Sequence, residues 1–146
     1  MAQEKVLLVI DNTVFSEKAA AFTAKLLKAN PDFSATLLYV GFPRDVLPDV
    51  PGAGWISRQE FEALVQKEAD AAFKKALTVI RSEGFGVQTV LKYGDPVEVV
   101  TRLVSQEGYT LVVLGGRETE DRLNYVLSST VYRLIHLLSI PLVIVK

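Results

Sequence analysis

Five short apolar segments alternate along the chain with longer segments in which apolar residues recur every three or four positions. The short segments are rich in Val, Leu and Ile, and most are continuous runs, which is typical of strands covered on both faces in a parallel sheet. The predicted strands are Val6–Ile10, Ser34–Val40, Phe85–Leu91, Thr110–Leu114 and Leu142–Val145. The predicted helices span about Ser16–Ala29, Ser57–Ser82 and Pro96–Gln106, and a fourth has an apolar face running from Leu123 to Leu138.

Capping signals fix several of these helix ends. Ser57 and Glu60 have the spacing of a capping box, and Asp95 followed by Pro96 supplies an N-cap and a proline at the first helical position. Gly108 lies just past the end of the third predicted helix. The second helix is expected to bury one side, formed by Phe61, Leu64, Val65, Ala69, Ala72, Ala76 and Ile80.

Strict alternation of strands and helices predicts a doubly wound, five-stranded parallel sheet with helices on both faces, a Rossmann-like α/β fold. The 146 residues are expected to form one domain spanning 1–146, which is long enough to build a core without disulfides. The segment from Gly41 to Trp55 holds three prolines among its residues, so we expect a loop that covers a site or moves.

Composition narrows the possible partners. The formal net charge is −1, which provides no electrostatic footprint for nucleic acid or an anionic membrane. No window approaches the ~20 apolar residues of a membrane span, so we expect no membrane partner. The sequence contains no cysteine, which excludes thiolate chemistry and is compatible with a reducing cytosol. We therefore expect a cytoplasmic protein without nucleic-acid or membrane partners.

The segment after the fourth predicted strand is the main candidate for chemistry. The apolar run stops at Gly115-Gly116 and leads toward a helix, the usual layout of an anion site on a parallel sheet. A tight turn without any ligand explains the same residues and is the favoured interpretation, because a short glycine signal is weak. Asp11, which follows the first strand, could contact a ribose or cap the first helix, and both roles stay open.

Four segments together resemble the universal stress protein family. They are Val6–Asp11, Gly94–Pro96, Leu111–Arg117 and Ile140–Val145. The resemblance covers the whole chain in element order and length. It implies a sheet with strand order 3-2-1-4-5, a role in the stress response, and a homodimer often made by pairing the last strands, here Leu142–Val145.

The resemblance also bears on nucleotide binding. Members that bind ATP carry Gly-x2-Gly-x9-Gly-Ser/Thr after the fourth strand, and here these positions hold Gly115, Glu118, Ser128 and Ser129. One of the three glycines is kept. In such members the aspartate that touches the nucleotide corresponds to Asp11 and the residue on the adenine side to Val40, so the adenosine end is preserved better than the phosphate end. The chain resembles the branch of the family that lacks the motif and is not thought to bind ATP.

The substituted motif is acidic. Residues 117–122 sum to −1, because Glu118, Glu120 and Asp121 outnumber Arg117 and Arg122. Carboxylates favour the positive end of a helix, so the chain could fill its own anion site. Either arginine could instead bind a phosphate. If a nucleotide binds, we expect its contacts to come from Asp11, Val40, Gly115, Gly116, Arg117, Ser128 and Ser129.

Two other features have modest implications. His136 is the one histidine, and without a cysteine or second histidine it cannot form a transition-metal cluster, so we expect a surface or packing role and no metal site. Leu142–Val145 is apolar and uncharged up to Lys146, and in the implied strand order it lies at an edge of the sheet. Such an edge invites pairing with a second copy.

Two functions from different classes follow. The first is a homodimeric stress-response protein that acts through contacts with an unknown protein partner, with no cofactor expected and ATP binding weak or absent. The alternative is an ATP/AMP-binding sensor or slow phosphohydrolase that uses ATP with magnesium. We find no residue set adequate for efficient catalysis. A small ligand of another kind, held under the 41–55 loop, is a third possibility.

Overall fold

The computed structural model describes residues 4–41, 57–81, 86–116 and 129–146. Strands and helices alternate along these residues. The elements are β1 (Glu4–Val9), α1 (Val14–Ala29), β2 (Phe33–Gly41), α2 (Arg58–Arg81), β3 (Gln88–Tyr93), α3 (Pro96–Glu107), β4 (Leu111–Gly115), α4 (Ser129–Leu137) and β5 (Leu142–Val145). Within these ranges, no helix combines the length and the apolar character needed to cross a membrane.

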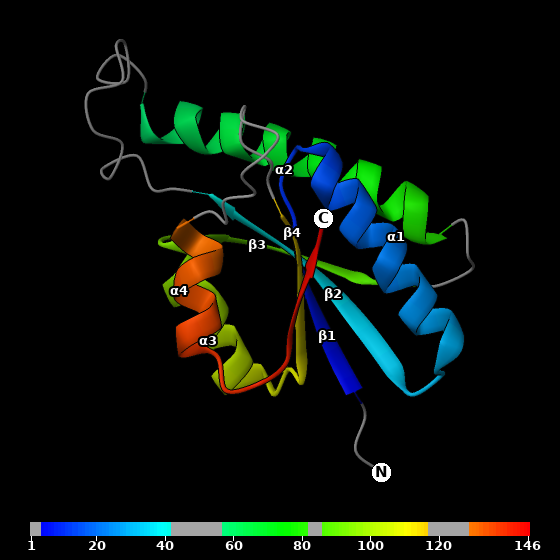
Figure 1. The fold of residues 1–146 in the computed structure, drawn as a ribbon. Coiled ribbons are helices and arrows are strands. Elements are labelled where there is room, and N and C mark those ends of the chain that lie inside the picture. Colours follow the sequence, from blue (N-terminus) through cyan, green and yellow to red (C-terminus); the bar gives the residue numbers. More distant parts are fainter. Residues whose placement is uncertain (1–3, 42–56, 82–85, 117–128) are drawn as a thin grey trace, which may run out of the picture.

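The five strands form one parallel sheet in the order β3-β2-β1-β4-β5, which confirms both the predicted fold class and the implied strand order. Helices α1 and α2 cover one face, and α3 and α4 cover the other (Figure 1). Strand β1 is central because Val6 is aligned with Ala35 of β2 on one side and with Leu111 of β4 on the other. The chain reverses its direction of travel across the sheet between β1 and β4, so a crevice opens there at the strand ends.

Each face of the sheet has its own apolar core. Alternate side chains of β1 belong to opposite cores, since Val6 and Leu8 pack with α1 and α2 while Leu7 packs with α3 and α4. All three are fully buried. Burial on both faces explains why the strand sequences are continuous apolar runs rather than alternating ones.

The ends of the elements differ from the predicted ends by one or more residues. The largest difference is in the third strand, predicted over Phe85–Leu91 and found over Gln88–Tyr93. This prediction was wrong because pairing with β2, rather than the apolar run, sets the strand: Tyr93 is aligned with Gly41, and the N–H of Gly94 donates to the carbonyl of Gly41 at 2.9 Å. Phe85 lies outside the described residues.

Helix α1 begins at Val14 rather than at Ser16, after the N-cap Thr13. Helix α4 is described from Ser129 to Leu137, so the predicted face residues before Ser129 lie outside the described chain. Leu138 follows the helix, and its N–H still donates to the carbonyl of Leu134 at 3.0 Å. The apolar spacing therefore identified the helices better than it identified their limits.

The predicted caps of α2 and α3 are present. The side chain of Ser57 accepts a hydrogen bond from the N–H of Glu60 at 3.1 Å. Asp95 accepts one from the N–H of Glu98 at 3.2 Å, with Pro96 at the start of α3. Gly108 ends that helix in the left-handed conformation, with φ of 71°, where glycine has no Cβ penalty.

Helix α2 is buried along only part of its length. Its second half supplies Ala69, Ala72, Phe73, Ala76 and Ile80 to the core. Its first half projects beyond the sheet, and Leu64, predicted to be on the inner side, is 52% exposed. Leu64 nevertheless lies on the predicted side of the helix with Phe61 and Val65, where it lines an open pocket rather than the core. Phe73 was missing from the predicted inner side.

Candidate functional site

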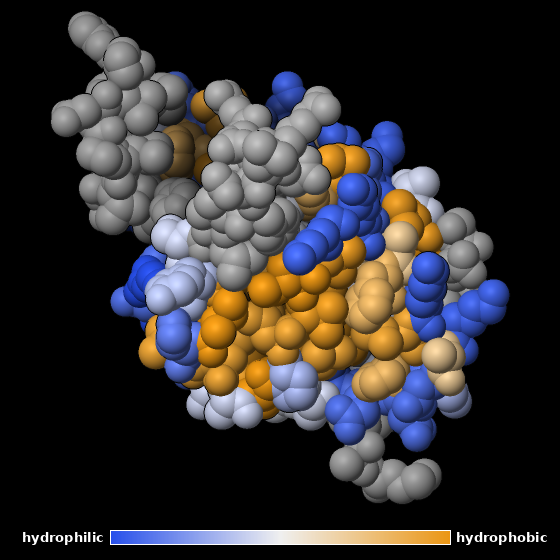
Figure 2. Space-filling model, in the orientation of Figure 1, coloured by the Kyte–Doolittle hydropathy of each residue, from blue (hydrophilic) through white to orange (hydrophobic). Residues whose placement is uncertain are grey.

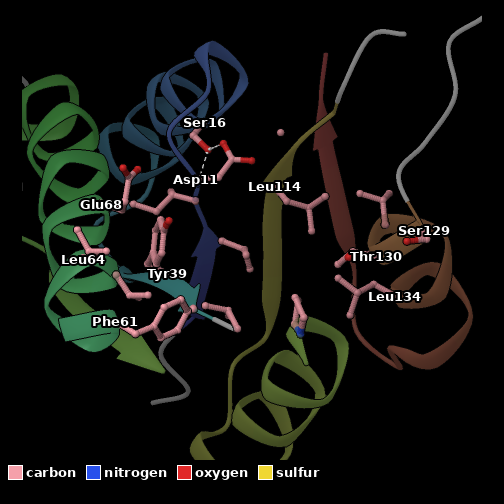
Figure 3. A pocket seen from close by; sticks show the side chains of 18 residues that line it. Asp11, Ser16, Tyr39, Phe61, Leu64, Glu68, Leu114, Ser129, Thr130 and Leu134 are labelled. Atoms are coloured by element: carbon pink, nitrogen blue, oxygen red, sulfur yellow. Dashed lines mark hydrogen bonds between the residues drawn. The ribbon is translucent and has the colours of Figure 1, made fainter. Parts of the chain in front are cut away.

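A pocket of about 620 Å³ opens at the carboxyl ends of β1, β2 and β4. It lies where the strand order reverses, between β1 and β4, which is the usual ligand position in open α/β sheets. Figure 3 shows that α2 forms one wall, with Phe61, Leu64 and Glu68, and α4 forms the opposite wall, with Thr130 and Leu134. The sheet contributes the floor through the ends of its strands.

Most of the lining is apolar. The apolar contribution comes from strand ends and from the inner turns of the flanking helices. These residues are Val9, Ile10, Val40, Phe61, Leu64, Val65, Pro96, Leu114, Val131 and Leu134. Polar groups gather mainly at the end of the pocket beside α1 and α2, where Asp11, Ser16 and Tyr39 face Glu68 (Figure 3). An apolar pocket with a few placed polar groups is the form of most small-molecule sites.

Asp11 lies in this pocket and also organises the start of α1. Its Oδ1 accepts hydrogen bonds from the backbone N–H of Thr13 at 3.0 Å, from the hydroxyl of Ser16 at 2.8 Å and from the hydroxyl of Thr13. The N-cap residue Thr13 makes no side-chain cap of its own. The Asp11 carboxylate therefore holds the turn that leads into α1 and lies at the positive end of the helix. Asp11 thus has a structural role in addition to its place in the pocket lining.

Tyr39 presents its phenol at the same end of the pocket. Burial raises the pKa of the Tyr39 phenol above its usual value, and the carboxylates of Glu68 and Asp11 raise it further because each disfavours a phenolate. The phenol is therefore a firmly protonated donor at neutral pH. The ring also packs edge-on against Phe73, with 6.4 Å between the ring centroids, so its position is held from below.

Glu68 is tied to the loop after β1 through Asn12. The Asn12 side-chain amide nitrogen donates to the backbone carbonyl of Glu68 and to its Oε2, both at 2.8 Å. These bonds fix the amide orientation, since the opposite orientation would set oxygen against oxygen. The other amide atom, Asn12 Oδ1, is buried and accepts no hydrogen bond from any described residue. The contact joins α2 to the β1–α1 turn across the rim of the pocket.

The glycine pair at the end of β4 has structural roles that require no ligand. A Cβ on Gly115 would lie 2.7 Å from the backbone of Phe15, a distance that no real Cβ adopts. The N–H of Gly116 donates to the carbonyl of Val145 at 2.7 Å and extends the β4–β5 ladder. Gly115 thus permits the close approach of α1, and the Gly116 donor is already occupied. Gly115 still lines the pocket.

The remaining predicted contacts divide between the described and undescribed parts of the chain. Val40 lines the pocket at the end of β2, as expected of an adenine-side residue. Ser129 is the first residue of α4 and lies on the opposite wall with Thr130 (Figure 3). Arg117, Ser128 and the acidic residues Glu118, Glu120 and Asp121 lie outside the described residues. The predicted loop Gly41–Trp55 lies outside them too, except for Gly41, which is the last residue of β2.

Tyr39 and Glu68 line the pocket but were not predicted from the sequence. Tyr39 directly precedes Val40 at a strand end, and that position was a usable signal. Glu68 had none, because it lies in the middle of a long helix among other charged residues. Only the tertiary packing of α2 against α1 and β2 brings it to the site.

His136 is exposed on α4 and packs edge-on against Tyr132, with 4.9 Å between the ring centroids. This agrees with the surface role expected from sequence. Across the described ranges, no group of three or more His, Asp or Glu side chains is placed to hold a metal ion.

Comparison with known proteins gives a consistent result. Residues 3–146 match the model of the universal stress protein family. A universal stress protein of Helicobacter pylori is 28% identical over 97% of this chain and 98% of its own length. The solved structure of universal stress protein UspA from Lactobacillus plantarum covers 100% of both chains at 16% identity and a TM-score of 0.77. The universal stress protein from Archaeoglobus fulgidus, solved in complex with dAMP, covers 99% of this chain and 98% of its own, at 16% identity and a TM-score of 0.67. On the strength of the full-length family match, this chain belongs to the universal stress protein family.

Proposed function

We propose that this stress-response protein acts in the cytoplasm as a homodimer through contacts with other proteins. Its pocket, in this proposal, takes an adenosine-type ligand and binds ATP weakly or not at all. The observation that carries the ligand proposal is the 620 Å³ pocket at the reversal point of the sheet, with Val40 and Asp11 among its lining residues. Family membership supports the stress-response role.

The β5 edge supports the dimer. The carbonyls of Pro141 and Val145 accept hydrogen bonds from β4, so the backbone groups of the alternate residues Leu142 and Ile144 point away from the sheet. The four side chains of β5 are all apolar and only half-buried. Figure 2 shows apolar surface over the region where Figure 1 places β5. Pairing two such edges about a two-fold axis would satisfy the outward groups and cover this surface.

Sedimentation velocity at micromolar concentration tests the dimer. We expect the mass of two chains, compared with 16.1 kDa for one. A protein that stays monomeric up to about 100 μM would contradict the proposal, because a dimer that weak could not dominate at cellular concentrations.

The pocket suits the adenosine part of a nucleotide better than its phosphates. The apolar walls can hold a base, and the structural neighbour from A. fulgidus was solved with a nucleoside monophosphate, dAMP. On the phosphate side, the Gly116 N–H already donates to Val145, and Glu118 occupies a position where ATP-binding members carry glycine. Fewer free backbone donors and added negative charge both weaken polyphosphate binding.

Isothermal calorimetry with adenosine, AMP and ATP with magnesium tests the ligand proposal. We expect measurable adenosine or AMP binding and ATP binding weaker than about 100 μM. Low-micromolar ATP binding would defeat it. The double substitution Glu118→Gly with Ser128→Gly restores the motif, and we expect it to tighten ATP binding while leaving adenosine binding nearly unchanged.

The alternative, an ATP/AMP-binding sensor or slow phosphohydrolase, is favoured by Gly115 in the pocket and by the two arginines at 117 and 122. Absorbance of the supernatant after denaturing the purified protein would reveal a copurified nucleotide. Nucleotide present at about one equivalent per chain would support the sensor. Protein free of nucleotide, combined with gain of ATP binding on Glu118→Gly, would exclude it.

A further inference from the structure

The charge of the pocket is unevenly distributed. Among the described residues that line it, Asp11 and Glu68 are the charged ones, and none is a lysine or arginine. Both carboxylates lie at the end formed by α1 and α2, and the phenol of Tyr39 lies between them (Figure 3). The described lining therefore carries net negative charge at one end.

The two carboxylates are not equivalent. Asp11 accepts hydrogen bonds from three donors of Thr13 and Ser16, which partly compensate its charge and hold it at the start of α1. Glu68 has one side-chain hydrogen bond, from Asn12 to Oε2, which fixes the carboxylate at the rim of the pocket. Fewer donors offset the charge of Glu68 than offset that of Asp11. A ligand in the pocket therefore experiences the Glu68 charge more strongly.

The Tyr39 phenol lies close enough to both carboxylates to be affected by their charge. After burial, the Glu68 carboxylate is the larger of the two charges that raise the pKa of the Tyr39 phenol, ahead of Asp11. A group that disfavours a phenolate within the pocket disfavours any other anion at the same place. An anion placed beside the Tyr39 phenol would therefore meet both carboxylates, and a phosphate elsewhere in the pocket would meet the longer-range part of the same repulsion.

We propose that Glu68 determines the charge class of the ligand: it admits adenosine and disfavours ligands in proportion to the number of phosphates they carry. This inference rests on the proposed adenosine-type ligand and adds a selecting residue from α2, on the wall opposite α4. Glu68 touches no described cation that would cancel its charge, and Asn12 holds it without neutralising it. The selection is electrostatic, so it weakens as salt screens the exposed carboxylate.

The test compares adenosine, AMP and ATP by calorimetry on the full chain with and without Glu68→Gln. Glutamine keeps an oxygen that can accept from Asn12, so the loop contact survives while the charge is lost. At low ionic strength we expect adenosine affinity to change less than about twofold, AMP to bind about threefold tighter and ATP about tenfold tighter, as Coulomb repulsion scales with ligand charge. At about 0.5 M salt these differences should shrink toward unity.

Asp70→Asn is the matched control. It removes the same charge from the same helix, but Asp70 bonds Gln66 and does not line this pocket. We expect it to leave all three affinities within about twofold of the natural protein. Equal changes for the three ligands in Glu68→Gln, or equal effects of the two variants, would overturn the role of Glu68 and leave the proposed function standing. Absence of binding of any of the three ligands to every variant would overturn the ligand proposal itself and this inference with it.

Discussion

The two edge strands of the sheet differ in character. Strand β3 is polar at both ends, with Gln88, Thr89 and Lys92 exposed, while β5 consists of four half-buried apolar residues. Both have an unpaired side in the sheet of the single chain, since the strand order places them at opposite ends. A lysine on an edge strand hinders pairing with another chain, and β5 has none before its end.

This difference indicates how the chain controls self-association. One edge carries a charged side chain that would have to be desolvated on pairing, and the other carries only side chains that gain from being covered. A single rule about exposed edges would treat the two alike. The composition of β3 hinders pairing with another chain, whereas the composition of β5 favours it.

The largest expected effect comes from placing a lysine on β5, as β3 has at Lys92. Ile144→Lys places a charge on the apolar edge, and in a two-fold dimer the charge occurs twice in one interface. We expect the dimer dissociation constant to rise at least about 100-fold, because an unpaired buried ammonium is costly. Sedimentation velocity over a concentration series measures it.

Thr89→Lys is the control on β3, where the same side chain is added to an exposed position of the polar edge. It should leave the mass of the assembly unchanged. A dimer lost in Thr89→Lys and kept in Ile144→Lys would reverse the assignment of the two edges.

A smaller effect is expected from two glycines that end the strands next to each edge. A Cβ on Gly115 of β4 would meet the backbone of Phe15 at 2.7 Å, while one on Gly41 of β2 would meet chiefly the side chain of Val65. The backbone of Phe15 can move away from an added Cβ less easily than the side chain of Val65 can. We expect Gly115→Ala to cost about 2–3 kcal/mol of unfolding free energy and Gly41→Ala about 1 kcal/mol. Urea denaturation measures both, and equal losses would show that the two sides of the sheet are equally rigid.

Asp95 links the turn after β3 to the helix that precedes β5. It caps α3 and lies 3.5 Å from the guanidinium of Arg133 in α4. We expect Asp95→Ala to cost about 1 kcal/mol through the lost cap. Asp95→Asn keeps the cap and loses only an exposed ion pair, so it should cost less than about 0.5 kcal/mol. Similar losses in the two variants by thermal unfolding would show that the ion pair matters more than the cap.

Alkaline pH should lower the stability of the protein through two tyrosines on the β3 side of the sheet. Tyr39 on β2 and Tyr93 on β3 both have a raised pKa, in each case mainly because of burial, and β5 contains no tyrosine. The unfolded phenol ionises near its ordinary value of 10.0 while the folded one keeps its proton, so stability falls as pH rises from about 10.

Removing a phenol should remove its contribution to the loss of stability at high pH. We expect Tyr39→Phe to make the loss of stability above pH 10 shallower, by at most about 1.4 kcal/mol per pH unit. Tyr93→Phe should do so less, because Tyr93 is 38% exposed. Urea unfolding at several alkaline pH values gives the slopes, and an unchanged slope in Tyr39→Phe would contradict the linkage.

The order and type of the elements could be predicted because they depend on local patterns. Continuous apolar runs marked the strands, and caps such as Asp95 marked helix starts. The limits of β3 could not be predicted, since the pairing of Tyr93 with Gly41 decides them. Nor could the exposure of Leu64, because helical periodicity does not reveal where a neighbouring sheet stops.

The site was predictable at strand ends and, through the family resemblance, at Ser129. Asp11 could be expected from the rule that ligands bind at the carboxyl ends of parallel strands, and Val40 from the family resemblance. Glu68 enters the pocket through the packing of α2, and the bond to Asn12 spans 56 residues of sequence. The engaged donor of Gly116 likewise depends on its distant partner Val145.

The central position of β1 has a consequence for biosynthesis. Its second neighbour, β4, lies about a hundred residues later, and Lys5 and Thr110, which bond each other, are 105 positions apart. At about 5–20 residues per second, a ribosome needs roughly 5–20 s to make that length of chain. For that time the nascent first strand has one open apolar side, so the early product is exposed to aggregation and to chaperones until β4 emerges from the exit tunnel.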